Sequence, residues 1–351
     1  MRGMNKDRTV RWLRGATLAA ALAAPLAGGL ALPAQANDSS AELRAGGLVF
    51  VANDVISMVS EDLFISEKEV RVRYLFRNPS DKDVTLLVAF PMPDLAHSES
   101  PISIPFPDAD NFLGFKTQVD GKPVETRMER RVIGLGLDRT KLLEDLKIPL
   151  APTWEQTVKA LDALPDDAKR KLLEIGLVRP DDYDAGKGWE HHLAPLDWTL
   201  KTTYYWTQTF PAKSDLKVEH RYAPSVGLSL GTLVGDTNPD SYIKRELRRM
   251  DEAYCMDGAF KAAVAKAPRP KDAPLPPFSE ARIGYILKTG ANWSGAISDF
   301  TLTVDKGAPE NLVSFCGTGV KKIGPTTFQM KAKDFLPEND LGILILKPQP
   351  K

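Results

Sequence analysis

The side chains that could carry acid–base or metal chemistry are few, because the 351-residue chain has only four histidines and two cysteines. Glu190, His191 and His192 form the one cluster of possible ligands. Neighbouring side chains of a strand point to opposite sides, so at most one of these histidines can share a face with Glu190. A metal site would need ligands from elsewhere, such as His97 or His220. We interpret the three clustered residues as solvated loop side chains and weak metal candidates, and we expect no cofactor.

An enzymatic alternative is a hydrolase that uses His191, His192 or His220 with an acidic residue. Residues 227–231, GLSLG, have the G-x-S-x-G spacing of a nucleophile elbow. That elbow needs a helix directly after its serine and a histidine later in the chain. Here Ser229 is followed by the glycine-rich run GTLVG, and the last histidine is His220. The motif therefore does not support this mechanism, and an enzyme is not our preferred interpretation.

Aromatic residues are densest between residues 189 and 206. Aromatic side chains on a sheet surface can stack on sugars or other ligands, although strands also favour them for packing. We name four candidate binding residues, with packing in the core or between domains as the preferred explanation: Trp198, Tyr204, Tyr205 and Trp206. His220 lies on the apolar face of its predicted strand and is interpreted as a hydrogen-bonded core residue.

The first 36 residues have the layout of a secretory leader. Five basic residues precede an apolar run over residues 16–32, and the triplet Ala34-Gln35-Ala36 follows. A basic, then apolar, then A-x-A order is typical of a cleavable signal peptide, with cleavage expected after Ala36. The alternative is a membrane anchor, but 17 residues are at the short limit for a span. We expect a periplasmic or secreted protein with no stable membrane span after cleavage.

Composition excludes several classes of protein. With 43% hydrophobic and 26% charged residues, the chain is too apolar for a disordered protein, and two cysteines are too few for a disulfide scaffold. Lys+Arg and Asp+Glu are 46 each, and the leader holds five of the bases and one of the acids, so the mature chain has a net charge of −4. A mildly acidic protein gives no general attraction to nucleic acid.

The two cysteines, Cys255 and Cys316, both follow the leader. In an oxidising compartment they have a single intramolecular pairing, which would join a helical stretch to a strand. The sequence therefore predicts a disulfide bond, with two buried free thiols as the alternative.

Hydrophobic periodicity predicts an α+β, mostly β fold with β-sandwich-like units and helical insertions. Val70, Val72, Tyr74 and Phe76 alternate with arginines, and Asp120-Gly121 marks a hairpin. Helical spacing begins near residue 137, and a loop is expected over 179–188. The expected segments are a leader over 1–36, an N-terminal β domain over 37–136, a helical insertion over 137–196, strands of the N-terminal or central sheet over 197–236, helices and a proline-rich connector over 237–277, and a C-terminal β region over 278–351.

Several motifs resemble those of one bacterial exported family. They include ANDSSAEL at 36–43, SEDLFIS at 60–66, AFPMP at 89–93, EHRYAPSVG at 219–227 and TGANW at 289–293. Together they resemble the family called domain of unknown function 4424 over nearly the whole mature chain. The resemblance implies an exported, signal-bearing protein with no established activity, so no catalytic residues are carried over. The N-terminal strands are also similar, over a thinner match, to the β-sandwich that opens inter-alpha-trypsin inhibitor heavy chains, which would suggest an interaction module.

These observations favour an envelope protein that is a non-enzymatic binding or interaction module. Its partner would be an envelope protein, a glycan or a small ligand, and not nucleic acid. The alternatives are the periplasmic hydrolase described above and an accessory subunit of an envelope assembly.

Overall fold

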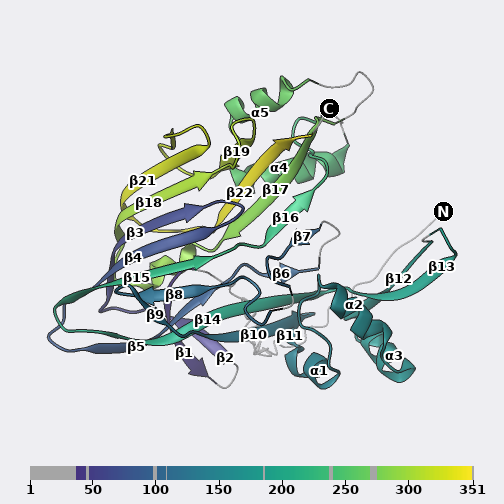
Figure 1. The fold of residues 1–351 in the computed structure, drawn as a ribbon, viewed down its shortest axis with the longest axis horizontal. Coiled ribbons are helices and arrows are strands. Elements are labelled where there is room, and N and C mark those ends of the chain that lie inside the picture. The colour runs from purple at the N-terminus through teal and green to yellow at the C-terminus, as the bar shows by residue number, and fades with distance from the viewer. Residues whose placement is uncertain are drawn as a thin grey trace, which may run out of the picture. The chain divides into compact units, whose positions relative to one another are not determined.

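The computed structural model describes residues 37–44, 47–97, 101–107, 109–184, 186–236, 240–268 and 275–349. The predicted leader and the centre of the proline-rich connector lie outside these residues. Strands predominate over helices in the described part of the chain, as predicted for a mostly β protein of the α+β class (Figure 1).

One sheet of the described chain has the strand order β11-β10-β14-β5-β1-β2, with β6 paired to β14. Its longest strand, β14, pairs with β10 on one side and β5 on the other. The strands are β1 (Ser39–Arg44), β2 (Gly47–Val51), β5 (Val84–Pro91), β6 (Leu95–Ala96), β10 (Arg127–Gly134), β11 (Leu137–Asp138) and β14 (Trp198–Phe210).

A second sheet has the order β20-β21-β18-β3-β4-β15-β8-β9. Here β18, near the C-terminus, pairs in parallel with β3, near the N-terminus, so the two ends of the described chain share one sheet. The strands are β3 (Ser57–Ile65), β4 (Val70–Asn78), β8 (Lys116–Val119), β9 (Lys122–Val124), β15 (Ser214–Tyr222), β18 (Ile297–Asp305), β20 (Lys321–Lys322) and β21 (Thr327–Phe335).

A third sheet has the order β19-β22-β17-β16-β7, and β12 and β13 form a separate two-stranded ribbon. Their bounds are β7 (Ile102–Ser103), β16 (Val226–Ser229), β17 (Phe278–Tyr285), β19 (Leu312–Phe315), β22 (Leu341–Pro348), β12 (Val178–Asp184) and β13 (Trp189–Pro195). The helices are α1 (Thr140–Asp145), α2 (Glu155–Asp162), α3 (Asp166–Glu174), α4 (Ser241–Tyr254), α5 (Gly258–Ala265) and the 3-10 helix η1 (Lys288–Asn292).

Local sequence explains several of these elements. In β4 the alternating apolar residues are buried and the intervening arginines face outward, because side chains of a strand alternate between its faces. The turn between β8 and β9 has positive φ at Asp120 (48°) and Gly121 (76°), as a tight hairpin of this kind requires. The predicted strand pattern and the predicted hairpin are both present.

The prediction of a loop over residues 179–188 is wrong for its first part, where strand β12 forms. Val178–Asp184 pairs with β13 through a continuous antiparallel register. The strand is polar and largely exposed, so it has no buried face to produce the alternation from which a strand is recognised. Pro180 is tolerated because β12 is an edge strand, where a missing ladder N–H costs little.

The principal core lies where the first two sheets meet. The ring of His220 on β15 is 5.0 Å from that of Phe90 on β5 and 5.2 Å from that of Trp206 on β14. Tyr285 on β17 adds the third sheet, because its ring is 6.3 Å from Phe90. Aromatic rings at these separations make favourable contacts beyond simple burial. The inward faces of all three sheets therefore contribute to one core.

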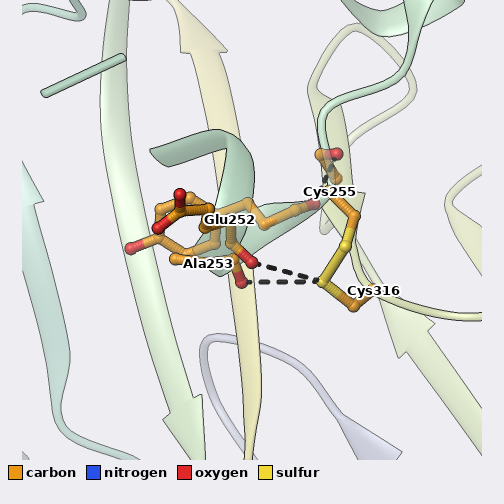
Figure 2. The surroundings of a disulfide bond; sticks show 6 residues. Glu252, Ala253, Cys255 and Cys316 are labelled. Atoms are coloured by element: carbon orange, nitrogen blue, oxygen red, sulfur yellow. Dashed lines mark hydrogen bonds between the residues drawn. A yellow bond between two sulfur atoms is a disulfide. The ribbon is translucent and has the colours of Figure 1, made fainter. Parts of the chain in front are cut away.

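The structure joins Cys255 to Cys316, the pair that the sequence predicts (Figure 2). Cys255 ends α4 in a left-handed conformation, and Cys316 directly follows β19. The Cα atoms are 4.9 Å apart, and Cys316 Sγ lies 3.8 Å from the carbonyl oxygen of Glu252. No residue of α4 is fully buried, so the bridge is a main attachment of this helix to the sheet.

Candidate functional site

Three of the four candidate binding residues on β14 face the core. Trp198, Tyr204 and Trp206 are 1%, 2% and 4% exposed. The Tyr204 hydroxyl donates a hydrogen bond to Asn111 Oδ1 (2.7 Å), and its ring stacks on Phe115 with centroids 4.3 Å apart. Their burial in the core gives the three side chains a packing role. Tyr205 is different, because the alternation of the strand places it on the opposite face of the sheet.

The face that carries Tyr205 is partly covered by the hairpin of β1 and β2. Ala41 and Leu48 of the hairpin pack with Ala89 of β5 in a small cluster of their own, and Tyr205 packs against it. Glu129 on β10 accepts a hydrogen bond from the backbone N–H of Leu48 (2.9 Å). The hairpin is therefore joined to β5 through the start of β1 and is held against the face of the sheet by an apolar cluster and a polar contact.

Gly47 shows how closely the hairpin approaches the sheet. Its φ is +105°, and a Cβ atom at this position would lie 2.5 Å from Glu129 Oε1. Only glycine allows both this backbone conformation and this approach without strain.

Beside this small cluster lies a pocket of about 440 Å³, which we call the hairpin pocket. Leu87 and Tyr205 give it an apolar wall, while Glu125 and Arg127 supply polar groups. Neither of these two charged side chains makes a hydrogen bond or an ion pair within the described residues. The lining residues are Leu43, Leu87, Val124, Glu125, Arg127, Tyr205, Trp206 and Thr207. Ligand sites commonly combine apolar walls with a few such polar groups.

A pocket of similar volume, about 460 Å³, lies on the outer face of the second sheet around Arg73. There the guanidinium is already paired with Glu219 (2.8 Å) and lies 3.9 Å from Asp62. A ligand that binds Arg73 would have to displace these partners. The charges of the hairpin pocket have no such competitor, so this pocket is the better candidate.

His220 occupies a fully buried position in the core. Its Nε2 lies 3.0 Å from Asp38 Oδ1, and its Nδ1 lies 3.0 Å from Thr117 Oγ1. Both His220 and Asp38 are 0% exposed. Desolvation raises the pKa of Asp38, and the neighbouring imidazole opposes that shift. An Asp–His pair that no substrate can reach supports the interpretation of His220 as a hydrogen-bonded core residue.

His192 is held between two carboxylates near the surface. Its Nδ1 lies 2.6 Å from Asp162 Oδ2 and its Nε2 lies 3.2 Å from Glu190 Oε2. These hydrogen bonds, that to Asp162 first, raise the pKa of His192. Asp162 also accepts from the backbone N–H of Leu193 (3.0 Å), so the arrangement fixes β13 to the end of α2.

His191 points to the other face of β13 and pairs with Asp182 (3.0 Å). The weak metal candidates are thus split between the two sides of the strand. Within the described residues, no group of three or more His, Cys, Asp or Glu side chains is arranged to hold a metal ion.

Sequence reasoning missed a buried polar cluster at the start of β1. Asn37, Asp38 and Glu61 are at most 1% exposed. A signal was present, because Glu61 stands two residues before the inward-facing Leu63, on the same side of β3. A register shift between Met58 and Ser60 interrupts the alternation of this strand, which hides the pattern.

No helix in the described part of the chain is both long enough and apolar enough to cross a membrane. Among curated proteins, no match to this chain is found. A crystal structure from Legionella pneumophila, described as a "putative nutrient binding protein", aligns with a TM-score of 0.40 and 14% identity over 89% of this chain and 70% of that chain. The model of one family, described as Domain of unknown function (DUF4424), matches residues 36–344. That match covers most of the sequence, and the chain belongs to this family.

Proposed function

We propose that this protein is an exported, non-enzymatic binding module that acts in the periplasm or outside the cell. The leader-like residues 1–36, with cleavage after Ala36, and the Cys255–Cys316 pair support export. We further propose that its sheets pack as β-sandwich-like units, because their inward faces share one core.

The hairpin pocket is the proposed binding site. The observation that carries this assignment is the combination of an apolar wall at Leu87 and Tyr205 with the charges of Glu125 and Arg127, which have no partner in the part of the chain that the structure describes. Such a pocket fits a small amphipathic ligand whose apolar body lies against the tyrosine ring and whose polar end meets the charged side chains. A volume of about 440 Å³ accommodates a molecule of modest size.

Binding rather than hydrolysis is favoured by where the histidines lie. His220 has an acid within hydrogen-bond distance, but both groups are fully buried. His192 is engaged at both ring nitrogens by carboxylates that also fix local structure. A general base must reach its substrate directly or through one water, and the buried pair does not meet this condition.

The test is a titration of the mature protein with 8-anilinonaphthalene-1-sulfonate, an aromatic anion that suits the proposed pocket. Replacing Tyr205→Ala removes the aromatic wall, and we expect the probe's Kd to rise about tenfold, equivalent to about 1.4 kcal/mol. Arg127→Ala should weaken binding by a similar factor because the sulfonate loses its cation. Tyr242→Ala is the matched control, since this tyrosine lies on α4 and is 56% exposed. Equal affinity for wild type and Tyr205→Ala, or a loss with Tyr242→Ala alone, would reject the hairpin pocket.

A further inference from the structure

The buried polar cluster at the start of β1 contains more acceptors than donors. We define this N-terminal cluster as Asn37, Asp38, Glu61, Tyr74 and His220, none of which is more than 2% exposed. Asn37 Nδ2 donates to Glu61 Oε2 (3.0 Å), and Tyr74 donates its hydroxyl hydrogen to Asn37 Oδ1. Within the described residues, two carboxylate oxygens, Asp38 Oδ2 and Glu61 Oε1, have no hydrogen-bond partner. Buried acceptors without a partner are rare in proteins and call for an explanation.

The charges in the N-terminal cluster are also unbalanced. It holds two carboxyl groups but only one group, His220, that can carry a positive charge, and His220 contacts Asp38. Desolvation raises the pKa of Glu61 to about 8, and the nearby charge of Asp38 contributes. As long as residue 37 is joined to residue 36, Glu61 therefore has no cationic partner in this cluster.

The backbone nitrogen of Asn37 lies inside the same cluster. It donates its hydrogen to Thr289 Oγ1, while the Thr289 hydroxyl donates to the Asn37 carbonyl oxygen (2.7 Å). Trp293 Nε1 donates to the carbonyl oxygen of Asp38 (2.6 Å). A peptide nitrogen can donate one hydrogen bond, which Thr289 takes, whereas an ammonium group can donate three. The start of β1 is thus fixed at a point where an α-amino group would be fully enclosed.

We propose that hydrolysis of the Ala36–Asn37 bond completes the fold, because the new α-ammonium group of Asn37 becomes the buried cation that pairs with Glu61. Water adds across the peptide bond, so that Ala36 keeps the carboxylate and Asn37 keeps the amine, which takes up a proton. The ammonium group thereby adds two N–H donors to a cluster in which, among the described residues, two acceptors have no partner. Cleavage before Asn37 therefore changes the stability of the protein's core. This inference rests on the proposed export and cleavage, but not on the hairpin pocket.

The test compares two chains with defined first residues, one beginning at Asn37 and the other at Ala36. Each is released from a fusion by a protease that cuts directly before the first residue. The leader is not needed for this comparison, because residues 34–351 form a compact unit of their own. In the longer chain an amide replaces the ammonium group and the terminal charge moves by one residue, about 3.8 Å. We expect the chain that begins at Asn37 to have a Tm higher by about 3 °C or more.

Glu61→Gln should remove this difference in Tm, because it takes away the anionic partner while keeping the size of the side chain. Asp62→Asn is the matched control, since the neighbouring carboxylate is on the exposed face of β3, with 54% of its side chain accessible. It should leave the difference unchanged. Equal Tm values for the two wild-type chains, or an unchanged difference in Glu61→Gln, would overturn the pairing.

A chemical measurement decides the question if Glu61→Gln does not fold. Reductive dimethylation at pH 7 labels free amines, and mass spectrometry reports the rate at the first residue. In the folded chain that begins at Asn37 the α-amine should react about tenfold more slowly than in the chain that begins at Ala36, because pairing with Glu61 raises the pKa of the amine and lowers its unprotonated fraction. Urea unfolding should abolish the protection, and equal rates in the folded chains would refute it.

Failure of the other proposals is distinguishable from failure of this one. A first residue other than Asn37 in the exported protein, identified by peptide mass spectrometry, would overturn the processing step. Failure of the sulfonate probe to bind would reject the hairpin pocket and leave the Tm and labelling results standing.

Discussion

Removal of the bridge between Cys255 and Cys316 should lower the stability of the mature protein by about 4 kcal/mol. The two residues are 61 positions apart, and closing a loop of that length in the unfolded chain has an entropic effect of about this size. With an unfolding entropy of about 2 cal/mol/K per residue, a chain of about 300 residues should lose about 7 °C in Tm. The perturbation is the double variant Cys255→Ser, Cys316→Ser.

The loss of stability should appear first in α4, because Cys255 ends this helix and none of the side chains of α4 is fully buried. Met250 and Tyr254 are partly buried and pack against a small apolar cluster of the third sheet. Without the bridge, the C-terminal end of α4 is held by these contacts, by the hydrogen bond that Ser314 Oγ donates to the Tyr254 carbonyl oxygen (2.9 Å) and by the ion pair of Asp251 with Lys261. Amide hydrogen exchange in Ser241–Tyr254 should therefore accelerate more than exchange in β4, which is paired on both sides.

The assay is thermal unfolding of the oxidised wild type, the reduced wild type and the double variant. The reduced protein is the control, because it loses the bridge and keeps both sulfur atoms, so its Tm should match that of the variant. An unchanged Tm in the double variant would refute the loop-closure reasoning. Two reactive thiols in the denatured, non-reduced exported protein would show that the bridge does not form.

Two further predictions test the packing of buried groups. In a chain that carries a residue before Asn37, burial raises the pKa of Glu61 to about 8 in the folded state, against 4.5 in the unfolded state. The contribution of protonated Glu61 to the free energy of unfolding is therefore complete below pH 4.5 and is lost as the pH rises towards 8. Urea unfolding at several pH values should show that the free energy of unfolding of the wild type falls, relative to that of Glu61→Gln, by about 1.4 kcal/mol per pH unit in this window. Parallel pH profiles of the two proteins would contradict this. Gly342→Ala should destabilise the protein by about 1–3 kcal/mol, because its Cβ would lie 2.8 Å from the Ala253 carbonyl oxygen at the end of α4. Gly284→Ala, at the position of β17 that pairs with Gly342, is the control in the same denaturation assay, because its Cβ would meet Pro93 at an ordinary distance of 3.7 Å. Equal losses of stability in the two variants would argue against the contact with α4.

Local patterns predicted the elements whose two faces differ. The alternation in β4 identifies a strand with a buried and an exposed face, and the Asp120-Gly121 pair identifies the turn after β8. The polar strand β12 escaped notice because pairing with β13, rather than burial of a face, makes it a strand. Hydrogen bonds between strands leave no mark in the composition of an exposed segment.

For the candidate site, the sequence by itself located the aromatic strand, the pair of cysteines and the leader-like segment, because these depend on residue type and short-range spacing. It could not separate Tyr205 from its buried neighbours without knowing which face of β14 meets the core. Nor could it bring Asp38, Glu61 and His220 together. Asp38 precedes β1, Glu61 lies on β3 and His220 lies on β15, and they meet only through the packing of two sheets. Side-chain chemistry is set by the chain, whereas burial and charge pairing arise between segments distant in sequence and are decided by the tertiary structure alone.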